Sequence, residues 1–385
     1  MSFGAPRMFL GATAIAITCL VVVAGAAGQG GAAPSSTERI PMSEEAFKNI
    51  QVLKGIPVDT FFDTMGMFAN SLGNDCTYCH SPKAYFDKAA FAEQTPLMNR
   101  ARGMILMMQT INKNYFKGEP RVTCFTCHGG SENPKAEPNI MLQYGVPPDD
   151  PNVRAFFPDT SFTADQVFDQ YVKALGGADR LAKFTSFNAK GTYAGFDTAR
   201  NKIPVEVYGR LQGQTAQQNT VIHMFNGDSI RTFDGQNGWI AGPDTPLPLV
   251  QLTSGNLERA QLEAEVPFGT MLRKSFSEWR TARASIGDRD VRVVQGVRDG
   301  QVVANFYFDD TGYLVRLIRW NKTPVTWVPT HIDLADYREL PGTGVKFPFR
   351  KVVTQTFQQT TVELSEVQPN VEVAATRFAK PKPGR

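Results

Sequence analysis

The sequence repeats one pattern twice, as CTYCH at residues 76–80 and as CFTCH at residues 124–128. These stretches contain every cysteine of the chain except Cys19. A C-x-x-C-H stretch is typical of covalent haem c attachment, in which the two thiols form thioethers to the porphyrin and the histidine ligates the iron. The sequence therefore predicts two covalently bound haem c groups. The predicted thioether residues are Cys76, Cys79, Cys124 and Cys127, and the predicted proximal iron ligands are His80 and His128.

Zinc and disulfide bonds are the alternatives for these cysteines. Two C-x-x-C pairs can form a four-thiolate zinc site, but residues 80–123 separate the pairs, far more than the roughly 15–20 residues of a zinc ribbon. Zinc also gives no role to the histidine after each pair. An exported chain normally oxidises its cysteines, but a disulfide across two intervening residues closes too small a loop to stabilise much. Haem attachment is therefore the preferred interpretation.

Residues 1–27 are typical of a secretory signal peptide. Arg7 carries the early positive charge, an apolar run extends over residues 8–23, and small residues follow at 24–26. We therefore expect an exported, periplasmic protein. The alternative is an uncleaved anchor, and hence membrane association, because the apolar run is only slightly shorter than the ~20 residues that span a bilayer.

Chain length and proline content divide the sequence near residue 160. A chain of 385 residues is expected to fold as about two domains. Prolines are dense in residues 136–160, which excludes a continuing helix and predicts a linker. We expect an α+β protein, with an α-helical di-haem cytochrome c domain at residues 40–135 and an antiparallel β-rich domain at residues 161–385. The net charge of +3 gives no support for nucleic acid as a partner.

Helical spacing of apolar residues precedes each C-x-x-C-H motif. One helix is predicted from residue 58 to residue 72, with Asp59 able to cap its start and Gly73 placed to end it. A second is predicted to begin near Pro96. The order helix, loop, motif thus occurs twice, as in an internal repeat.

Methionines on these helices are candidates for the distal iron ligands. Only four histidines exist, so two distal histidines would have to be His223 and His331 from the strand-rich region. A thioether is a soft ligand that favours ferrous iron and raises the reduction potential. We therefore expect one methionine per haem, while the others pack beside the cofactor. The candidates, between which periodicity does not choose, are Met65, Met67, Met104, Met107 and Met108.

Residues after 160 alternate between apolar and polar positions, as in half-buried strands. A helix is predicted first, from residue 163 to residue 175, and another near residues 256–278. Asp299 and Gly300 separate two apolar runs, which predicts a two-residue hairpin. The pattern favours an antiparallel, meandering sheet.

Residues 45–135 resemble the first two haem units of the cytochrome c subunit of photosynthetic reaction centres. The likeness lies in residues 49–53, 61–65, 101–107, 111–112 and 122–130. In that family a methionine of the preceding helix is the distal ligand, and the matching positions are Met65 and Met104. The family has four haems, whereas no cysteine follows Cys127 here. The resemblance implies electron transfer with a membrane-bound complex.

The strand-rich region is similar to the curved half-barrel domains of periplasmic lipoprotein carriers. The likeness lies in residues 171–177, 308–315 and 345–349. It implies a curved sheet with a concave apolar face, which would hold a lipid or quinone-like molecule, or dock on a partner or on the haem domain.

Three functions are consistent with these features. The preferred one is a periplasmic carrier of single electrons between a donor and an acceptor protein, without enzyme activity. The second is a di-haem peroxidase, in which one iron loses its sixth ligand. The third is a lipid-binding or partner-binding half-barrel whose haem segment serves as a redox sensor.

Overall fold

The computed structural model describes residues 39–134, 136–137, 140, 153–243, 245 and 247–383. The expected signal peptide and much of the expected linker lie outside these residues. The described residues from Ile40 onwards belong to one compact unit. Among the helices that the structure describes, none combines the length and the apolar character needed to cross a membrane.

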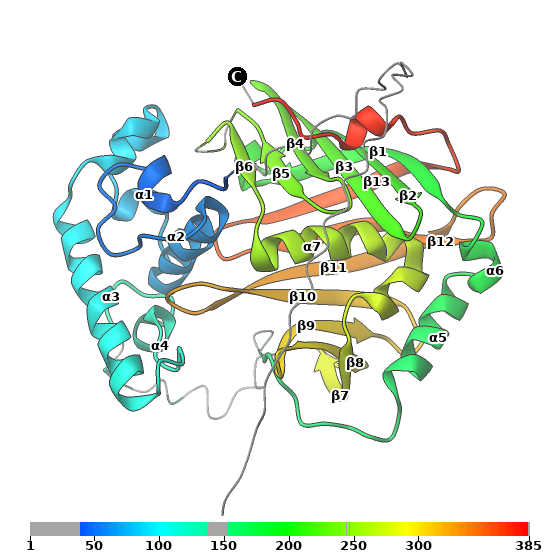
Figure 1. Cartoon of the computed structure of the whole chain (residues 1–385), viewed down its shortest axis with the longest axis horizontal. Helices are drawn as coiled ribbons and strands as arrows, with labels where there is room; N and C mark the ends of the chain where they lie inside the picture. Colours follow the sequence, from blue (N-terminus) through cyan, green and yellow to red (C-terminus); the bar gives the residue numbers. More distant parts are fainter. Residues whose placement is uncertain are drawn as a thin grey trace, which may run out of the picture. The chain divides into compact units, whose positions relative to one another are not determined.

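Helices and short helical turns make up residues 40–134 (Figure 1, blue and cyan). The long ones, α2 (Val58–Leu72) and α3 (Pro96–Tyr115), confirm both predicted helices. α2 ends at Gly73 with a φ of 67°, a left-handed conformation that glycine adopts without strain. α3 follows Thr95, whose side-chain oxygen accepts the backbone N–H of Met98. The shorter elements are α1 (Ser43–Ala46), η1 (Cys76–Tyr78), η2 (Pro82–Tyr85), η3 (Lys88–Ala92) and α4 (Cys124–His128).

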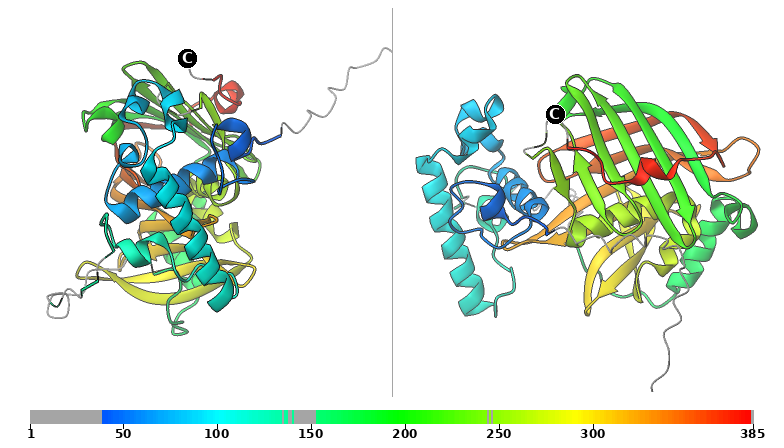
Figure 2. Two further views of the ribbon diagram at one scale, coloured as in Figure 1. Left: turned by 90° about the vertical axis from the view of Figure 1, so that its left-hand side faces the viewer. Right: turned by 45° about the horizontal axis from the view of Figure 1, so that its top comes forward.

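One antiparallel sheet of 13 strands forms most of the remaining structure (Figures 1 and 2). The strand order is β6-β5-β4-β3-β2-β1-β13-β12-β11-β10-β9-β8-β7. Strands that follow each other in the chain therefore pair, with one exception: β6 and β7 form the two edges of the sheet. β1 also pairs with β13. The sheet curves around a helix, as Figure 2 shows, which confirms the expected antiparallel, curved architecture.

The strands are β1 (Ser186–Gly195), β2 (Ile203–Gln212), β3 (Thr215–Met224), β4 (Gly227–Phe233), β5 (Gly238–Ala241), β6 (Leu249–Gln251), β7 (Glu278–Ile286), β8 (Arg289–Arg298), β9 (Gln301–Phe308), β10 (Leu314–Lys322), β11 (Trp327–Glu339), β12 (Lys346–Thr354) and β13 (Gln359–Pro369). The helical elements around them are α5 (Ala164–Ala174), α6 (Ala178–Leu181), η5 (Phe196–Thr198), α7 (Ser254–Glu265), η6 (Val266–Lys274) and η7 (Ala375–Phe378).

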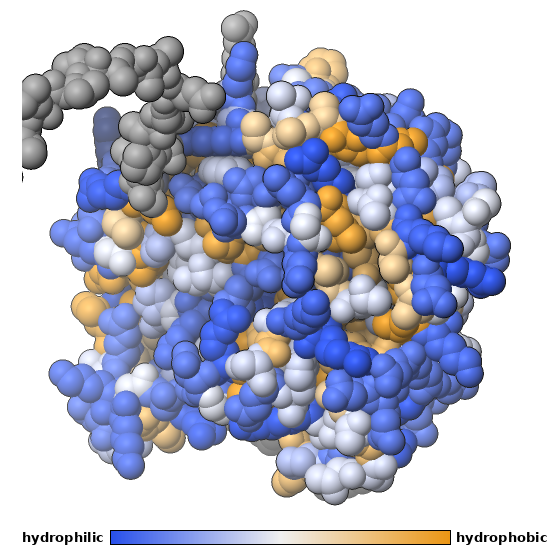
Figure 3. Space-filling model, turned by 45° about the vertical axis from the view of Figure 1, so that its right-hand side comes forward, coloured by the Kyte–Doolittle hydropathy of each residue, from blue (hydrophilic) through white to orange (hydrophobic). Residues whose placement is uncertain are grey.

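The main core lies on the concave side of the sheet, beneath α5, η6 and α7. Aromatic rings fill much of it, and the centroids of contacting pairs lie 5.1–6.4 Å apart among Phe184, Phe187, Phe268 and Phe347. On the face shown in Figure 3, polar residues cover most of the surface and apolar residues appear in patches between them. The chain's own helices thus cover much of the apolar face that the half-barrel resemblance implies.

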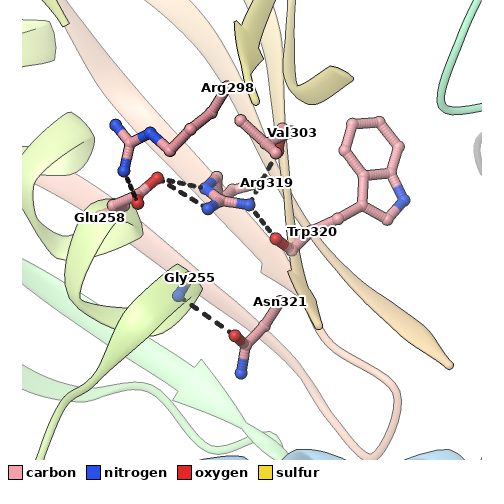
Figure 4. A network of polar contacts seen from close by, with 7 residues as sticks. All are labelled: Gly255, Glu258, Arg298, Val303, Arg319, Trp320 and Asn321. Atoms are coloured by element: carbon pink, nitrogen blue, oxygen red, sulfur yellow. Dashed lines mark hydrogen bonds and ion pairs between the residues drawn. The ribbon is translucent and has the colours of Figure 1, made fainter. Parts of the chain in front are cut away.

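Polar contacts hold α7 on the strands (Figure 4). Glu258 of α7 accepts hydrogen bonds from Nε and Nη2 of Arg319, at 3.1 and 2.7 Å, and also pairs with Arg298. The buried Arg319 donates to two backbone carbonyl oxygens as well. One turn earlier, the backbone N–H of Gly255 donates to Oδ1 of Asn321 at 3.1 Å. Because the buried charges have hydrogen-bond partners, α7 has a defined position on the sheet.

Candidate functional site

The first C-x-x-C-H motif forms a tight helical turn. η1 begins after Asp75, whose carboxylate accepts the backbone N–H of Thr77 at 2.8 Å. The backbone N–H of His80 donates to the carbonyl oxygen of Cys76 at 3.0 Å. Residues three apart on such a turn are neighbours on one face. Cys76, which is exposed, and Cys79, which is half-buried, therefore have the spacing that two thioethers to one porphyrin need.

A backbone hydrogen bond orients His80. Its Nδ1 lies 2.8 Å from the carbonyl oxygen of Phe91. A carbonyl oxygen only accepts, so Nδ1 carries the proton and Nε2 keeps a free lone pair for a metal. The Phe91 ring packs edge-on against the imidazole, with centroids 5.2 Å apart. Burial lowers the pKa of His80, which favours the neutral ring that binds iron.

The second motif repeats this arrangement on α4. The side-chain oxygen of Thr123 accepts the backbone N–H of Thr126 at 3.2 Å and so caps the helix. His128 is buried, and its Nδ1 lies 3.1 Å from the carbonyl oxygen of Ser131, which again leaves Nε2 for a metal. Burial raises the pKa of the Cys124 thiol to about 11. The Cys124 side chain is therefore held as a neutral thiol in this environment.

Asn112 positions the backbone segment that leads into the second motif. This buried residue of α3 accepts the N–H groups of Arg121 and Val122 at 3.1 and 2.9 Å, and its amide donates to the carbonyl oxygen of Val122 at 2.7 Å. Asn112 is one of the residues that carry the family resemblance, but an asparagine inside a helix gives no local sign of this positioning role.

The candidate distal methionines differ in their surroundings. Met65 on α2 packs against a small apolar cluster that joins α2 and α3. Met104 on α3 is 39% exposed and Met107 is 52% exposed, whereas Met67 and Met108 are buried. Buried methionines suit the packing role, and accessible ones suit ligation. Met65 and Met104 as the two ligands stay a prediction.

Contacts that no sequence pattern predicts join the segments that contain the two motifs. Helix α2, which leads to the first motif, packs against α4, which contains the second. The backbone N–H of Gly130 donates to the carbonyl oxygen of Ser71 on α2 at 2.9 Å. The side-chain amide of Asn74 donates to Glu132 at 3.2 Å. The two helix-loop-motif units are therefore not independent of each other.

The residues around the motifs fit haem c. Each motif supplies two thiols and an oriented imidazole, and the preceding helices supply thioethers. Several large apolar side chains of the helical part are exposed, and a porphyrin needs apolar side chains to pack against. They are Tyr85, Phe86, Leu106, Met107 and Phe125. Within the described part of the chain, no three His, Cys, Asp or Glu side chains form a metal-binding group.

Two buried carboxylates hold α2 on the sheet. The expectation that Asp59 caps α2 is wrong, because the N-cap is a proline and Asp59 instead accepts the N–H and the hydroxyl of Thr253, each at 2.7 Å. Asp63 accepts from the amides of Asn256 and Asn321 at 2.8 and 2.7 Å. Burial raises the pKa of Asp59 and brings that of Asp63 to about 6. The partners come from α7 and β10, so no local sequence pattern reveals this contact.

The two other histidines lie on strands of the sheet. His223 of β3 pairs with Asp228 at 2.9 Å between Nδ1 and Oδ1. His331 lies on β11, where burial lowers its pKa to about 4. Both environments are those of structural histidines.

Comparison with known proteins places the similarity in the helical part. Residues 22–142 match the family model for the photosynthetic reaction centre cytochrome C subunit. The subunit of Roseobacter denitrificans is 25% identical over 141 residues, which is 29% of this chain and 37% of that protein. The subunit of Thermochromatium tepidum is 29% identical over 106 residues, 26% of this chain and 25% of that protein. The matches confirm the resemblance of this segment, and the chain spans only 25–37% of the length of these relatives.

Solved structures match the strand-rich part more weakly. A DUF1329 family protein from Desulfovibrio piger has a TM-score of 0.38 at 10% identity, covering 56% of this chain and 96% of its own. A LolA superfamily protein from Nitrosomonas europaea has a TM-score of 0.36 at 10% identity, covering 57% and 99%. TM-scores of this size carry no argument about function.

Proposed function

We propose that this protein is a di-haem c-type cytochrome that carries single electrons between redox partners and catalyses no reaction of its own. One observation carries the proposal. In both motifs the histidine Nδ1–H is directed at a backbone carbonyl oxygen, so that Nε2 is available for iron. The match of residues 22–142 to the cytochrome family supports it.

The chain holds, orients and shields the two haems. The cysteine pairs would fix each porphyrin at two points, and the backbone hydrogen bonds of His80 and His128 fix the imidazole planes. A bound haem supplies an iron that alternates between the ferric and ferrous states. The contact between α2 and α4 keeps the two motifs at one separation, so the distance that an electron crosses stays constant.

Met65 and Met104 are the proposed distal ligands. Both sit on the helix before a motif, and both match the ligand positions of the family that the segment resembles. Met107 is a matched control, because it lies on the same helix as Met104 and is similarly exposed.

The cellular setting is also part of the proposal. The export signal at residues 1–27 would place the mature chain in the periplasm, with a di-haem domain at residues 40–135, a linker at 136–160 and a β-rich domain at 161–385. The partners would be a donor and an acceptor redox protein, one of them part of a membrane-bound electron-transfer complex. The cavity between α7 and the sheet measures about 60 Å³, which holds a few heavy atoms, so we do not include a lipid or quinone-like ligand.

The experiment is expression with the cytochrome maturation machinery, followed by mass spectrometry and electron paramagnetic resonance. We expect the mass of the chain plus two haems, and two low-spin irons. Met104→Ala should convert one iron to high spin, whereas Met107→Ala should leave both low-spin. A colourless product, or a mass without two macrocycles, would overturn the proposal. A wild-type protein with one high-spin iron that reacts with peroxide would favour the peroxidase instead.

A further inference from the structure

A small cavity between α7 and the concave face of the sheet is lined by three cationic side chains. Arg231 comes from β4, Arg259 from α7 and Lys351 from β12. These elements are far apart in the sequence, and the fold brings their positive charges to one partly buried place.

The cations outnumber the anions around this cavity. Glu263 of α7 is the single carboxylate among the lining residues, and it accepts from Nη1 of Arg259 and from Nζ of Lys351, each at 2.9 Å. Burial pushes the pKa of Glu263 upward, but the charges of Lys351 and Arg259 outweigh this and bring it to about 2. With Glu263 ionised, the lining carries three positive charges against one negative charge. No carboxylate among the described residues forms an ion pair with Arg231.

Two donors at this cavity lack a partner. The Nε–H groups of Arg231 and Arg259 are buried and have no hydrogen-bond acceptor among the described residues. Arg259 is only 9% exposed. A buried N–H without an acceptor is unfavourable, and more so when the group is charged. The carbonyl oxygen of Gln218, another lining residue, also lacks a donor.

The cavity has room for a compact ligand. Its volume is about 60 Å³, and a water molecule needs roughly 10–15 Å³ on this scale, so on the order of four or five heavy atoms fit. A phosphate-sized oxyanion has this size. It supplies acceptors for both unpartnered N–H groups, balances the charge excess, and in its hydrogen phosphate form offers one O–H to Gln218.

We propose that this cavity binds one small free oxyanion of the phosphate class, held by Arg231 and Arg259. A guanidinium suits this role because its N–H groups match the geometry of phosphate oxygens. The site is independent of the haem motifs, so it can be tested whatever the outcome of the haem experiment.

The test is isothermal titration calorimetry on the haem-loaded, full-length mature protein with inorganic phosphate, at constant ionic strength set by chloride. We expect one site per chain. Arg231→Gln should weaken binding about tenfold or more, because it removes a charge-assisted contact. Arg231→Lys, which keeps the charge but loses Nε–H, should show a smaller loss. Arg289→Gln, at the exposed first residue of β8, should bind as the wild type does.

Other outcomes would overturn the proposal. Weak, sub-stoichiometric heat that Arg231→Gln does not change would show an adventitious ion only. Binding of lysophosphatidate without binding of phosphate would assign the site to a lipid headgroup and not to a free anion. A crystal structure grown in phosphate with only water at Arg231 would show that solvent fills the cavity.

Discussion

Replacing Asn256 by alanine should weaken the attachment of α2 to the sheet. Asn256 is 5% exposed, and its amide donates to Asp63 at 2.8 Å and to Asp59 at 3.3 Å. The variant loses both donors, while the two buried carboxylates keep their bonds to Thr253 and Asn321.

The expected loss follows from these contacts. A hydrogen bond to a buried charged group contributes about 1.5–3 kcal/mol, and the 3.3 Å contact is too long to count fully. Alanine returns roughly 0.5 kcal/mol, because it is the better helix former within α7. The free energy of unfolding should therefore fall by about 1–2.5 kcal/mol. A double-mutant cycle with Asp63→Ala should give a coupling energy of about 1–2 kcal/mol.

Urea unfolding of the haem-loaded protein measures both quantities. Soret absorbance follows the haem segment, and far-ultraviolet circular dichroism follows the sheet. We expect one shared transition in the wild type and an earlier Soret transition in Asn256→Ala. Asn114→Ala, at an exposed position of α3, is the matched control and should change little. A variant within about 0.5 kcal/mol of the wild type, or a coupling energy near zero, would refute the reasoning.

Three further perturbations test other parts of the structure. Gly73→Ala should lower the free energy of unfolding by roughly 2–3 kcal/mol, because φ is 67° and a Cβ would meet the carbonyl oxygen of Gly130. Gly118→Ala, with φ of 83° and open space around it, should lower Tm by clearly less than Gly73→Ala does. Equal losses in the two variants would contradict the packing argument. Asn112→Ala removes three hydrogen bonds before the second motif and should reduce haem attachment there, so that mass spectrometry finds a one-haem species; full loading at unchanged stability would speak against a positioning role. Burial lowers the pKa of His331 to about 4 from its ordinary value of 6.5. Between these pH values the unfolded chain binds a proton that the folded chain does not, so the free energy of unfolding should fall by up to about 3 kcal/mol as the pH drops from 6.5 to 4. His331→Gln should lack this part of the pH dependence, and the same pH dependence in the variant and the wild type would contradict the assignment to His331.

Local patterns predicted much of the secondary structure. The apolar spacing before each motif located α2 and α3, because one face of each helix is buried. Thr163 caps α5 through the N–H of Gln166. Asp299 and Gly300, with φ of 51° and 73°, form the predicted hairpin turn between β8 and β9. These features depend on residues close together in the chain.

The contacts between segments could not be predicted from the sequence. Asp59 is a residue type that often caps a helix. Only the fold shows that its partner is Thr253, 194 residues later. Likewise, Arg231, Arg259 and Lys351 look like ordinary surface cations until the sheet curves and places them around one cavity. Such roles arise from tertiary packing, which leaves no periodic signal in a single sequence.

The bond between Asp63 and Asn321 joins residues 258 positions apart. Residues 40–134, which contain both thiol pairs, are therefore synthesised long before β10, the strand that carries Asn321. We expect this delay to leave the motifs accessible to the enzymes that attach the cofactor. Closure of a contact with such a long intervening loop is slow, so the haem segment would join the sheet as one of the last steps of maturation.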